Sequence, residues 1–277
     1  MNKFNLVLLC KKDHIGAFLR VDLHNHTTRC NHATGSMCEY IQKAIDLGVD
    51  IYGFSDHAPM EFDKKYRMSF DQLQGYFQEI EQLQDEYKDQ ITILKALEVD
   101  YLPGYMHRRV LEADVDYLIG SIHFLNGWGF DNPEFIGRYE KEDINSIYKN
   151  YFTALKELAS SQLFDVVAHL DLIKVFGYRP TIDLLQIAKP ALDQIKKSGM
   201  SVEISSAGLR KPVQECYPSK ELLEYAYSIG IDITFGSDAH SVDQVGYGYS
   251  QARTLAKEVG YTQCAIYRGR KKELVTF

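Results

Sequence analysis

No apolar run in the chain approaches the roughly 20 residues that a membrane-spanning helix needs, so we expect no transmembrane span. The apolar stretch Leu6–Cys10 is short and is followed by three charged residues, which does not fit a secretion signal. The five cysteines are odd in number and include no CxxC pair, which argues against a disulfide framework and indicates a reducing compartment. We therefore expect a cytoplasmic protein whose cysteines are small core residues.

Positive charge is also scarce. The 31 Lys and Arg residues stand against 38 Asp and Glu, and the formal net charge is −7. A chain with this balance has no overall positive field to hold a phosphate backbone, so we expect no nucleic-acid partner. With 45% hydrophobic and 25% charged residues and only 7 prolines, the composition is that of an ordinary folded domain.

Short β-rich apolar runs alternate along the chain with longer segments of helical periodicity. We expect strands at Phe18–Leu23, Asp50–Phe54, Ile91–Leu97, Tyr117–Ile122, Asp165–Ala168, Met200–Ile204 and Ile231–Phe235. We expect helices at Ser36–Leu47, Ser69–Lys88, Asp143–Ser160, Ile182–Ser198, Ser219–Ile229 and Val242–Val259. Three of these segments begin with serine and four are followed by glycine, residues that commonly cap and stop helices.

This alternation predicts parallel strands, because right-handed crossovers join each strand to the next. Seven such strands favour a closed barrel over an open doubly wound sheet, which usually has a glycine-rich phosphate turn after its first strand. Here that turn reads His-Asn-His-Thr-Thr. We therefore expect one α/β domain over residues 18–277, a TIM-like (β/α)7 barrel, with residues 1–17 as an N-terminal appendage and Gly127–Arg138 as a long loop.

Histidines gather where the predicted strands end. Six of the nine lie within about three residues of the carboxyl end of a strand: His24, His26, His57, His123, His169 and His240. Random placement would put fewer than one of them there. Because parallel barrels carry their chemistry on the loops that follow the strands, these positions predict a functional site at that end of the barrel.

The spacing within these segments is typical of metal ligation. His24 and His26 are two residues apart and so lie on one face, and Asp238 and His240 repeat this spacing after the last strand. Each pair alone is equally consistent with a turn or a cap. Glu98 ends an apolar strand, where a buried carboxylate needs a compensating positive charge. A metal ion supplies that charge.

With His32 added, the set contains seven histidines, Glu98 and Asp238, a nitrogen and oxygen shell without thiolate. Such a shell suits Zn²⁺, Fe²⁺ or Mn²⁺ and contains too much nitrogen for Mg²⁺ or Ca²⁺. His123 and His169, taken singly, are equally consistent with hydrogen-bonded core residues. Nine ligands exceed the need of one ion, so we expect two or three divalent transition-metal ions that share a bridging carboxylate.

Six ordered motifs contain these residues. They are Asp22-Leu-His24-Asn-His26 with His32, Ser55-Asp56-His57, Leu97-Glu98-Val99-Asp100, Gly120-Ser-Ile-His123-Phe124, Ala168-His169-Leu-Asp171 and Gly236-Ser-Asp238-Ala-His240. Together they resemble the polymerase and histidinol phosphatase (PHP) superfamily of metal-dependent phosphoesterases. Four further segments look like the L-histidinol-phosphate phosphatase branch: Glu98–Gly104, Ser121–Phe124, Trp128–Pro133 and Glu203–Pro212.

The resemblance implies a distorted (β/α)7 barrel and an enzyme that hydrolyses L-histidinol phosphate to L-histidinol and phosphate in histidine biosynthesis. It also implies three ion sites bridged by Glu98. The implied sets are His24, His26, Glu98 and Asp238 around one ion, His32, His57 and His240 around a second, and Glu98, His123 and His169 around a third.

For this reaction we hypothesise in-line attack on phosphorus by a hydroxide that bridges two ions. The expected catalytic residues are Glu98, Asp238 and Asp171, and the expected substrate-binding residues are Arg210, Lys174 and Arg179. Arg210 is the preferred phosphate clamp because a guanidinium group binds two oxygens at once. Asp171 would either donate a proton to the leaving alkoxide or orient a ligand histidine.

Three alternatives remain open at the level of sequence. The first is a PHP phosphoesterase that acts on nucleotides, phosphotyrosine or DNA ends, since the same metals would serve. The second is a metal-binding module without catalysis, although such a module would not need all nine ligands. The third is an amidohydrolase barrel, which often has a bridging lysine after its fourth strand, where this chain has Ser121 and His123. The motifs do not indicate an oligomeric state.

Overall fold

The computed structural model describes residues 18–277 and contains a barrel of seven parallel strands. The N-terminal appendage predicted over residues 1–17 lies outside the described residues. The strands are β1 (Val21–Asp22), β2 (Ile51–Phe54), β3 (Thr92–Asp100), β4 (Tyr117–Ser121), β7 (Val166–Val167), β8 (Ser201–Ser205) and β9 (Ile233–Gly236), paired in that order. All seven coincide with predicted strands, which confirms the TIM-like α/β fold.

Hydrogen bonds between the first and last strands bring the ends of the sheet together. Leu23 N donates to Phe235 O over 2.8 Å, and Asp238 N donates to His24 O over 2.7 Å. The buried carboxylate of Asp22 adds side-chain contacts here, because it accepts from Ser237 N at 2.9 Å and from Ser237 Oγ at 2.6 Å. The two segments that carry predicted ligands from opposite ends of the chain are thereby held side by side.

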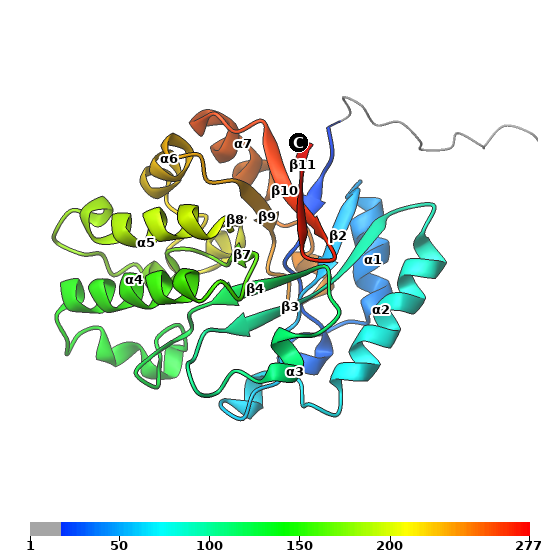
Figure 1. The fold of residues 1–277 in the computed structure, drawn as a ribbon, viewed down its shortest axis with the longest axis horizontal. Coiled ribbons are helices and arrows are strands. Elements are labelled where there is room, and N and C mark those ends of the chain that lie inside the picture. The colour runs from blue at the N-terminus through cyan, green and yellow to red at the C-terminus, as the bar shows by residue number, and fades with distance from the viewer. Residues whose placement is uncertain (1–17) are drawn as a thin grey trace, which may run out of the picture.

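Helices pack around the outside of the strands (Figure 1). They are α1 (Met37–Asp46), α2 (Leu73–Tyr87), α4 (Ile144–Ser161), α5 (Leu184–Ser198), α6 (Lys220–Ser228) and α7 (Tyr249–Val259), with the short α3 (Arg108–Leu111). Ser36 caps α1 in a reciprocal capping box with Glu39, as its position predicts. The last helix begins later than expected because Gly246 and Gly248 adopt positive φ angles of 62° and 68°.

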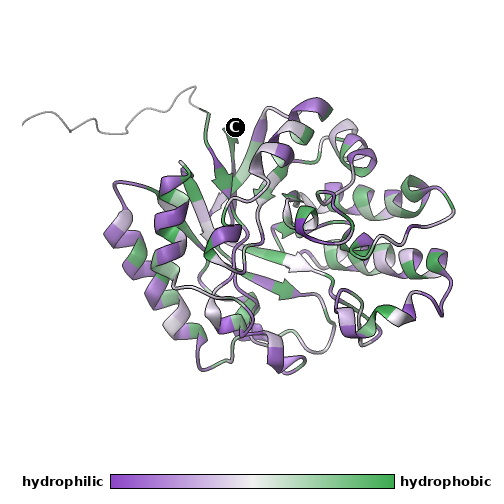
Figure 2. Cartoon of the chain, turned by 180° about the vertical axis from the view of Figure 1, so that it is seen from behind, coloured by the Kyte–Doolittle hydropathy of each residue, from purple (hydrophilic) through white to green (hydrophobic). Residues whose placement is uncertain are grey.

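Alternation along β3 shows how one strand serves both the core and the site. Leu94 and Ala96 belong to the apolar cluster inside the barrel, whereas Leu97 and Val99 pack in the cluster between the strands and the helices. Because side chains alternate along a strand, Glu98 follows Leu94 and Ala96 on the inner face. Figure 2 shows the outward-facing positions of the surrounding helices as mainly hydrophilic.

A C-terminal hairpin, absent from the sequence predictions, covers the amino ends of the strands. It consists of β10 (Gln263–Arg268) and β11 (Lys271–Thr276), paired antiparallel. The hydroxyl of Tyr267 donates to Asp165 O at 2.9 Å and hydrogen-bonds with Ser201 Oγ at 2.8 Å. Since Asp165 and Ser201 lie where β7 and β8 begin, the hairpin lies opposite the end where the predicted ligands gather.

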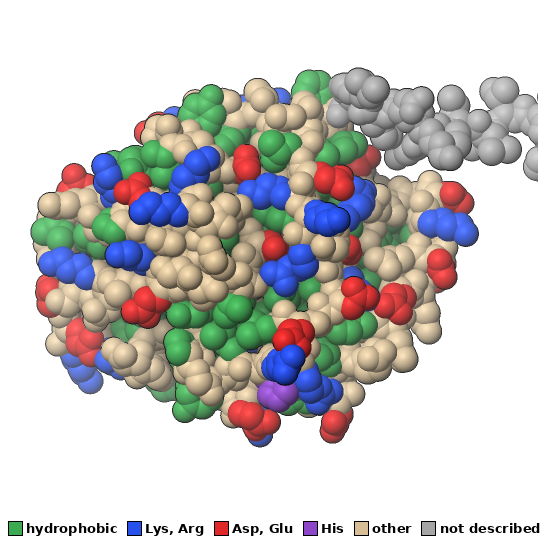
Figure 3. All heavy atoms as spheres, in the orientation of Figure 1, with side chains coloured by type: hydrophobic (Ala, Val, Ile, Leu, Met, Phe, Trp, Pro, Cys, Tyr) green, Lys and Arg blue, Asp and Glu red, His purple; other side chains and the backbone are tan. Residues whose placement is uncertain are grey.

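The loop expected over Gly127–Arg138 contains regular structure. Near its start β6 (Trp128–Gly129) pairs with β5 (Phe124–Leu125), which precedes the loop, and its last residues form a 3-10 helix, Pro133–Arg138. No helix among residues 18–277 is long and apolar enough to cross a membrane. On the face in Figure 3, basic and acidic side chains are interspersed.

Candidate metal centre

The predicted ligands converge at the carboxyl end of the barrel, where each strand delivers its side chain. His24 and His26 follow the end of β1, His57 follows the end of β2, and Asp238 and His240 follow the end of β9. Glu98 lies within β3, and His123, His169 and His32 follow β4, β7 and a 3-10 turn, respectively. The geometry therefore brings all nine predicted ligands to one end of the fold.

Glu98 lies at the middle of the cluster and is only 1% exposed. Its Oε2 atom lies 2.9 Å from His57 Nδ1, 3.4 Å from His24 Nε2 and 3.6 Å from His26 Nε2. Its Oε1 atom lies 3.1 Å from His169 Nε2 and 3.8 Å from His123 Nε2. One carboxylate thus faces five imidazole rings, as a bridging ligand would.

Donor atoms fall into small groups whose members lie within 4.8 Å of one another. These groups are His24, His26 and Asp238; Glu98, His123 and His169; His26, His57 and His240; Cys30, His32 and His240; and His26, Cys30 and Asp56. The second group matches one predicted ion site in full, and the first contains three of the four residues of another. The third and fourth groups together contain the three residues predicted for the remaining site, His32, His57 and His240. The grouping accommodates more than one ion.

Unpartnered polar atoms indicate that this cluster is built for cations. His240 Nε2 and His169 Nδ1 are buried without a hydrogen-bond partner, and the buried Glu98 Oε2 faces three imidazole nitrogens, of which His57 Nδ1 is the nearest at 2.9 Å. A buried polar atom left unsatisfied costs about 1–3 kcal/mol, and a cation that accepts its lone pair removes that cost. Since imidazole nitrogen and carboxylate oxygen are ligands of divalent transition metals, the residues present fit such ions.

Electrostatics keep Glu98 ionised and divide the imidazoles of the cluster. Burial raises the pKa of Glu98, but His24, His57 and His123 outweigh burial and hold that pKa well below its usual range. Burial lowers the pKa of His57 to about 4 despite the neighbouring Glu98. An ionised carboxylate beside a neutral imidazole is the combination that metal ligation requires. Although burial lowers the pKa of His26, contacts with Asp238 and Asp56 raise it to about 9. Asp100 in the same way raises the pKa of His123 to about 10, so a metal ion would displace a proton from these two rings.

Two carboxylates that the sequence predictions missed hold predicted ligands in place. Asp100 Oδ1 lies 2.7 Å from His123 Nδ1, and Asp56 Oδ1 lies 3.3 Å from His26 Nδ1. Such contacts orient an imidazole so that its other nitrogen faces the ion. Asp100 was detectable in principle, because it is two residues beyond Glu98 on the same face of β3.

A thiol also borders the cluster, beside the predicted nitrogen and oxygen ligands. Cys30 Sγ lies within 4.8 Å of ligand atoms of His32 and His240, and it hydrogen-bonds to Thr27 O at 3.1 Å. The expectation that the cysteines are small core residues is confirmed for Cys30, Cys216 and Cys264, whereas Cys38 is exposed and Cys10 lies outside the described residues.

Arg210 lies against the same end of the barrel. Its Nη2 atom donates to the backbone oxygens of Ser237 and Asp238, both at 2.9 Å. Its Nη1 atom is buried and has no hydrogen-bond partner. The guanidinium group therefore keeps free donor capacity beside a predicted ligand.

The other predicted substrate-binding residues have partners within the protein. Lys174 is fully buried, and its Nζ lies 2.9 Å from Asp171 Oδ2, 2.9 Å from Cys216 O and 3.2 Å from Glu215 Oε2. Arg179 pairs with Glu215 at 2.7 Å. Because these acceptors use the three protons of Lys174, the geometry favours Arg210 as the phosphate-binding candidate.

Asp171 is buried at the start of the 3-10 turn that follows His169. Its Oδ2 accepts from Ser219 N at 2.9 Å and pairs with Lys174, while Oδ1 has no hydrogen-bond partner. These contacts join the loops after β7 and β8. Because Oδ2 is held by Ser219 and Lys174, the geometry favours a structural role for Asp171 over proton donation.

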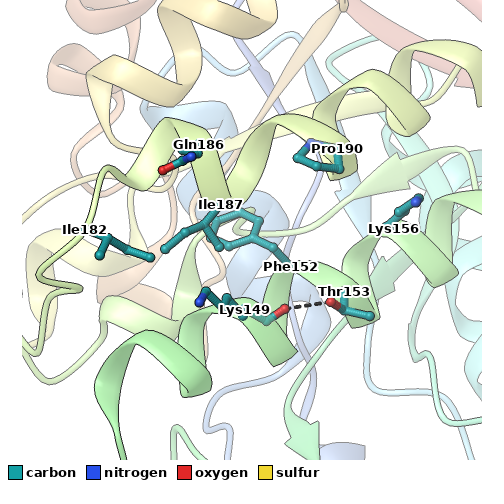
Figure 4. Close-up of a pocket in the computed structure, with 8 residues that line it drawn as sticks. All are labelled: Lys149, Phe152, Thr153, Lys156, Ile182, Gln186, Ile187 and Pro190. Carbon is teal, nitrogen blue, oxygen red and sulfur yellow. Dashed lines mark hydrogen bonds between the residues drawn. The ribbon is translucent and has the colours of Figure 1, made fainter.

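A separate surface pocket of about 420 Å³ lies between α4 and α5. Its lining residues are Lys149, Phe152, Thr153, Lys156, Ile182, Gln186, Ile187 and Pro190 (Figure 4). None of them is a predicted site residue. The histidine cluster at the strand ends therefore remains the candidate site.

Comparison with known proteins supports this assignment. The PHP domain pattern matches residues 22–207, more than half of the chain. A Deinococcus radiodurans protein named "Probable histidinol-phosphatase" is 38% identical over 257 residues, which cover 91% of this chain and 98% of that protein. The histidinol-phosphatase of Bacillus subtilis is 28% identical over 260 residues, covering 82% and 96%, respectively.

The fold has a counterpart among solved structures. The crystal structure of histidinol phosphate phosphatase from Lactococcus lactis, complexed with zinc, L-histidinol and phosphate, superposes with a TM-score of 0.78 at 23% identity. The match covers 93% of this chain and 100% of that one. At this identity the likeness concerns the fold, a barrel of the same kind. From its domain match and its near full-length relatives, the chain belongs to the PHP family, in the histidinol-phosphatase branch.

Proposed function

We propose that this protein is a metal-dependent phosphomonoesterase that hydrolyses L-histidinol phosphate to L-histidinol and phosphate. The observation that carries the proposal is the convergence of seven histidines, Glu98 and Asp238 at one end of the barrel. The near full-length relatives named for this activity support the substrate. The reaction belongs to histidine biosynthesis, and we place the enzyme in the cytoplasm without a nucleic-acid partner.

Nine residues would hold two or three divalent ions, which we propose to be zinc, iron or manganese. They are His24, His26, His32, His57, Glu98, His123, His169, Asp238 and His240. Such ions neutralise phosphate charge and make water a nucleophile at neutral pH. Glu98 would bridge, because its two oxygens face different groups of histidines.

The chain itself positions the ester. Arg210 would bind non-bridging phosphate oxygens through its free Nη1 donors, while Nη2 stays fixed on the backbone of Ser237 and Asp238. A guanidinium group fixed in this way stabilises charge that builds up on the phosphoryl oxygens in the transition state. Asp238, with its Oδ1 only 3.0 Å from His26 Nε2, would complete the carboxylate set beside Glu98.

Phosphate release from a panel of monoesters tests the proposal. The enzyme, purified without chelator, receives L-histidinol phosphate, a nucleoside monophosphate, phosphotyrosine and a 5′-phosphorylated single-stranded DNA. We expect kcat/KM to be at least about 100-fold higher for L-histidinol phosphate, as differential transition-state binding allows. Preference for another ester would overturn the substrate, and no turnover of any ester would overturn the activity.

A matched pair of variants separates the site from the rest of the chain. Glu98→Gln keeps the shape and removes the bridging charge, so we expect turnover to fall below detection. Glu215→Gln changes a carboxylate that is about half exposed, outside the cluster, and we expect turnover within about twofold of the wild type.

A further inference from the structure

Glu203 is a buried carboxylate inside the barrel to which the proposed function assigns no role. It lies in the middle of β8 and is 1% exposed. Its Oε1 atom lies 2.8 Å from His24 Nδ1, and its Oε2 atom accepts a hydrogen bond from the backbone N–H of His169 at 2.8 Å. Both oxygens are therefore committed to residues that belong to different groups of the cluster.

Space for this carboxylate is reserved by a glycine on the neighbouring strand. A Cβ atom at Gly236 would lie 1.9 Å from Glu203 Oε1 and 2.6 Å from His24 Cβ, distances that no real side chain tolerates. The sequence of β9 thus leaves room for Glu203 to reach His24. The fold therefore provides the space in which Glu203 contacts His24.

The contact with His24 decides which ring nitrogen is free. A carboxylate next to Nδ1 holds the proton on that nitrogen, which leaves Nε2 with its lone pair. His24 Nε2 is the atom that faces Glu98 Oε2 at 3.4 Å and Asp238 Oδ1 at 3.9 Å. Glu203 therefore presents the lone pair of His24 to the cluster.

The contact with His169 holds an uncommon backbone conformation. His169 has a φ angle of +24°, which side-chain-bearing residues rarely adopt. Its N–H is fixed by Glu203, and its ring then places Nε2 at 3.1 Å from Glu98 Oε1. A carboxylate that accepts this N–H offsets part of the conformational cost.

We propose that Glu203 is a positioning residue that prepares two groups of ligands at once, by fixing the tautomer of His24 and the backbone of His169. Asp100 and Asp56 each contact one histidine ring, whereas Glu203 joins two ligand positions from β1 and β7. The inference rests on the proposed metal centre and does not depend on which ester is the substrate.

Metal affinity of Glu203→Gln tests this role. An amide has one acceptor oxygen, so it cannot accept from both His24 Nδ1–H and His169 N–H. We expect at least one metal equivalent to bind about 10- to 100-fold more weakly than in the wild type, measured by competition with a chromogenic chelator. We also expect kcat to fall, KM to change less than threefold, and excess metal to restore activity. Glu215→Gln is the control and should bind all equivalents as the wild type does.

Wild-type metal affinity in a folded Glu203→Gln protein would overturn the proposal. If that variant does not fold, Glu203→Asp provides a second test, because the shorter side chain keeps the charge but withdraws the carboxylate from His24 and His169. The same selective loss of metal affinity is expected there, and unchanged affinity would overturn the proposal. A wild-type protein that binds metal but prefers another ester would refute the proposed substrate and leave the role of Glu203 standing.

Discussion

Arg210 donates a hydrogen bond through Nη2 to the backbone oxygen of Asp238, and its buried Nη1 has no hydrogen-bond partner. We expect Arg210→Ala to lower kcat/KM for L-histidinol phosphate about 10- to 100-fold, since a charge-assisted hydrogen bond contributes about 1.5–3 kcal/mol. Arg179→Ala is the control, because Arg179 is 38% exposed and paired with Glu215. Initial rates of phosphate release give kcat/KM for both variants. An Arg210→Ala enzyme within twofold of the wild type would remove Arg210 from the substrate site.

Substitution of Asp171 tests whether this buried carboxylate takes part in the reaction or stabilises the fold. Because it pairs with the fully buried Lys174, Asp171→Asn leaves a buried cation partly uncompensated. We expect the free energy of unfolding to fall by about 3 kcal/mol, and the pH profile of kcat to keep its shape. Urea denaturation and a pH–rate series measure the two effects. Loss of the base-side limb of the profile would restore Asp171 as the general acid, because a general acid must be protonated to act.

We expect the exposed thiol of Cys38 to react faster than the buried ones. Burial raises the pKa of Cys264 to about 12 and that of Cys216 to about 11, so only a minute fraction of either thiol is thiolate at pH 8. The exposed Cys38 has no such protection from solvent. We expect iodoacetamide at pH 8 to modify Cys38 in the folded protein before Cys216 and Cys264, as read by peptide mass mapping. Equal modification rates would contradict the described packing, and raising the pH should accelerate the buried thiols most.

At the scale of elements, strand–helix alternation predicted the barrel, yet it did not predict the hairpin of β10 and β11. Within the hairpin, Arg270 pairs with Asp165 and Lys272 pairs with Asp232. Those contacts join segments that are far apart in the chain, and no local pattern encodes them. The convergence of the proposed ligands could be predicted because their positions at strand ends are a local pattern. The contacts of carboxylates such as Glu203 could not, because their partners lie on other strands.

The hairpin should stabilise the barrel without affecting the chemistry at its other end. Tyr267→Phe removes the hydroxyl that contacts Asp165 and Ser201, and we expect a loss of about 1 kcal/mol. In a thermal melt this corresponds to about 2–4 °C. Lys271→Ala, an exposed position on β11, should change Tm by less than about 1 °C. A fall of more than twofold in kcat/KM in Tyr267→Phe would contradict the expectation that the hairpin does not affect the chemistry at the other end of the barrel.

At the scale of the whole molecule, a chain with a formal charge of −7 is proposed to bind an anionic ester. Its surface alone would not attract that ester, so the attraction must come from the ions at the strand ends. The fold places Glu98, Asp238 and seven histidines there, with the apolar interior and the hairpin at the other end. Activity and metal content should therefore rise together.

Titration of metal into stripped enzyme tests this account most directly. The wild-type protein is treated with chelator, desalted, and reconstituted with zinc, iron(II) or manganese(II), while bound metal and phosphate release from L-histidinol phosphate are measured on the same samples. We predict that stripped enzyme has less than about 1% of the reconstituted activity, and that turnover saturates at two or three equivalents per chain. Full turnover by the stripped enzyme, or saturation below one equivalent, would contradict the account.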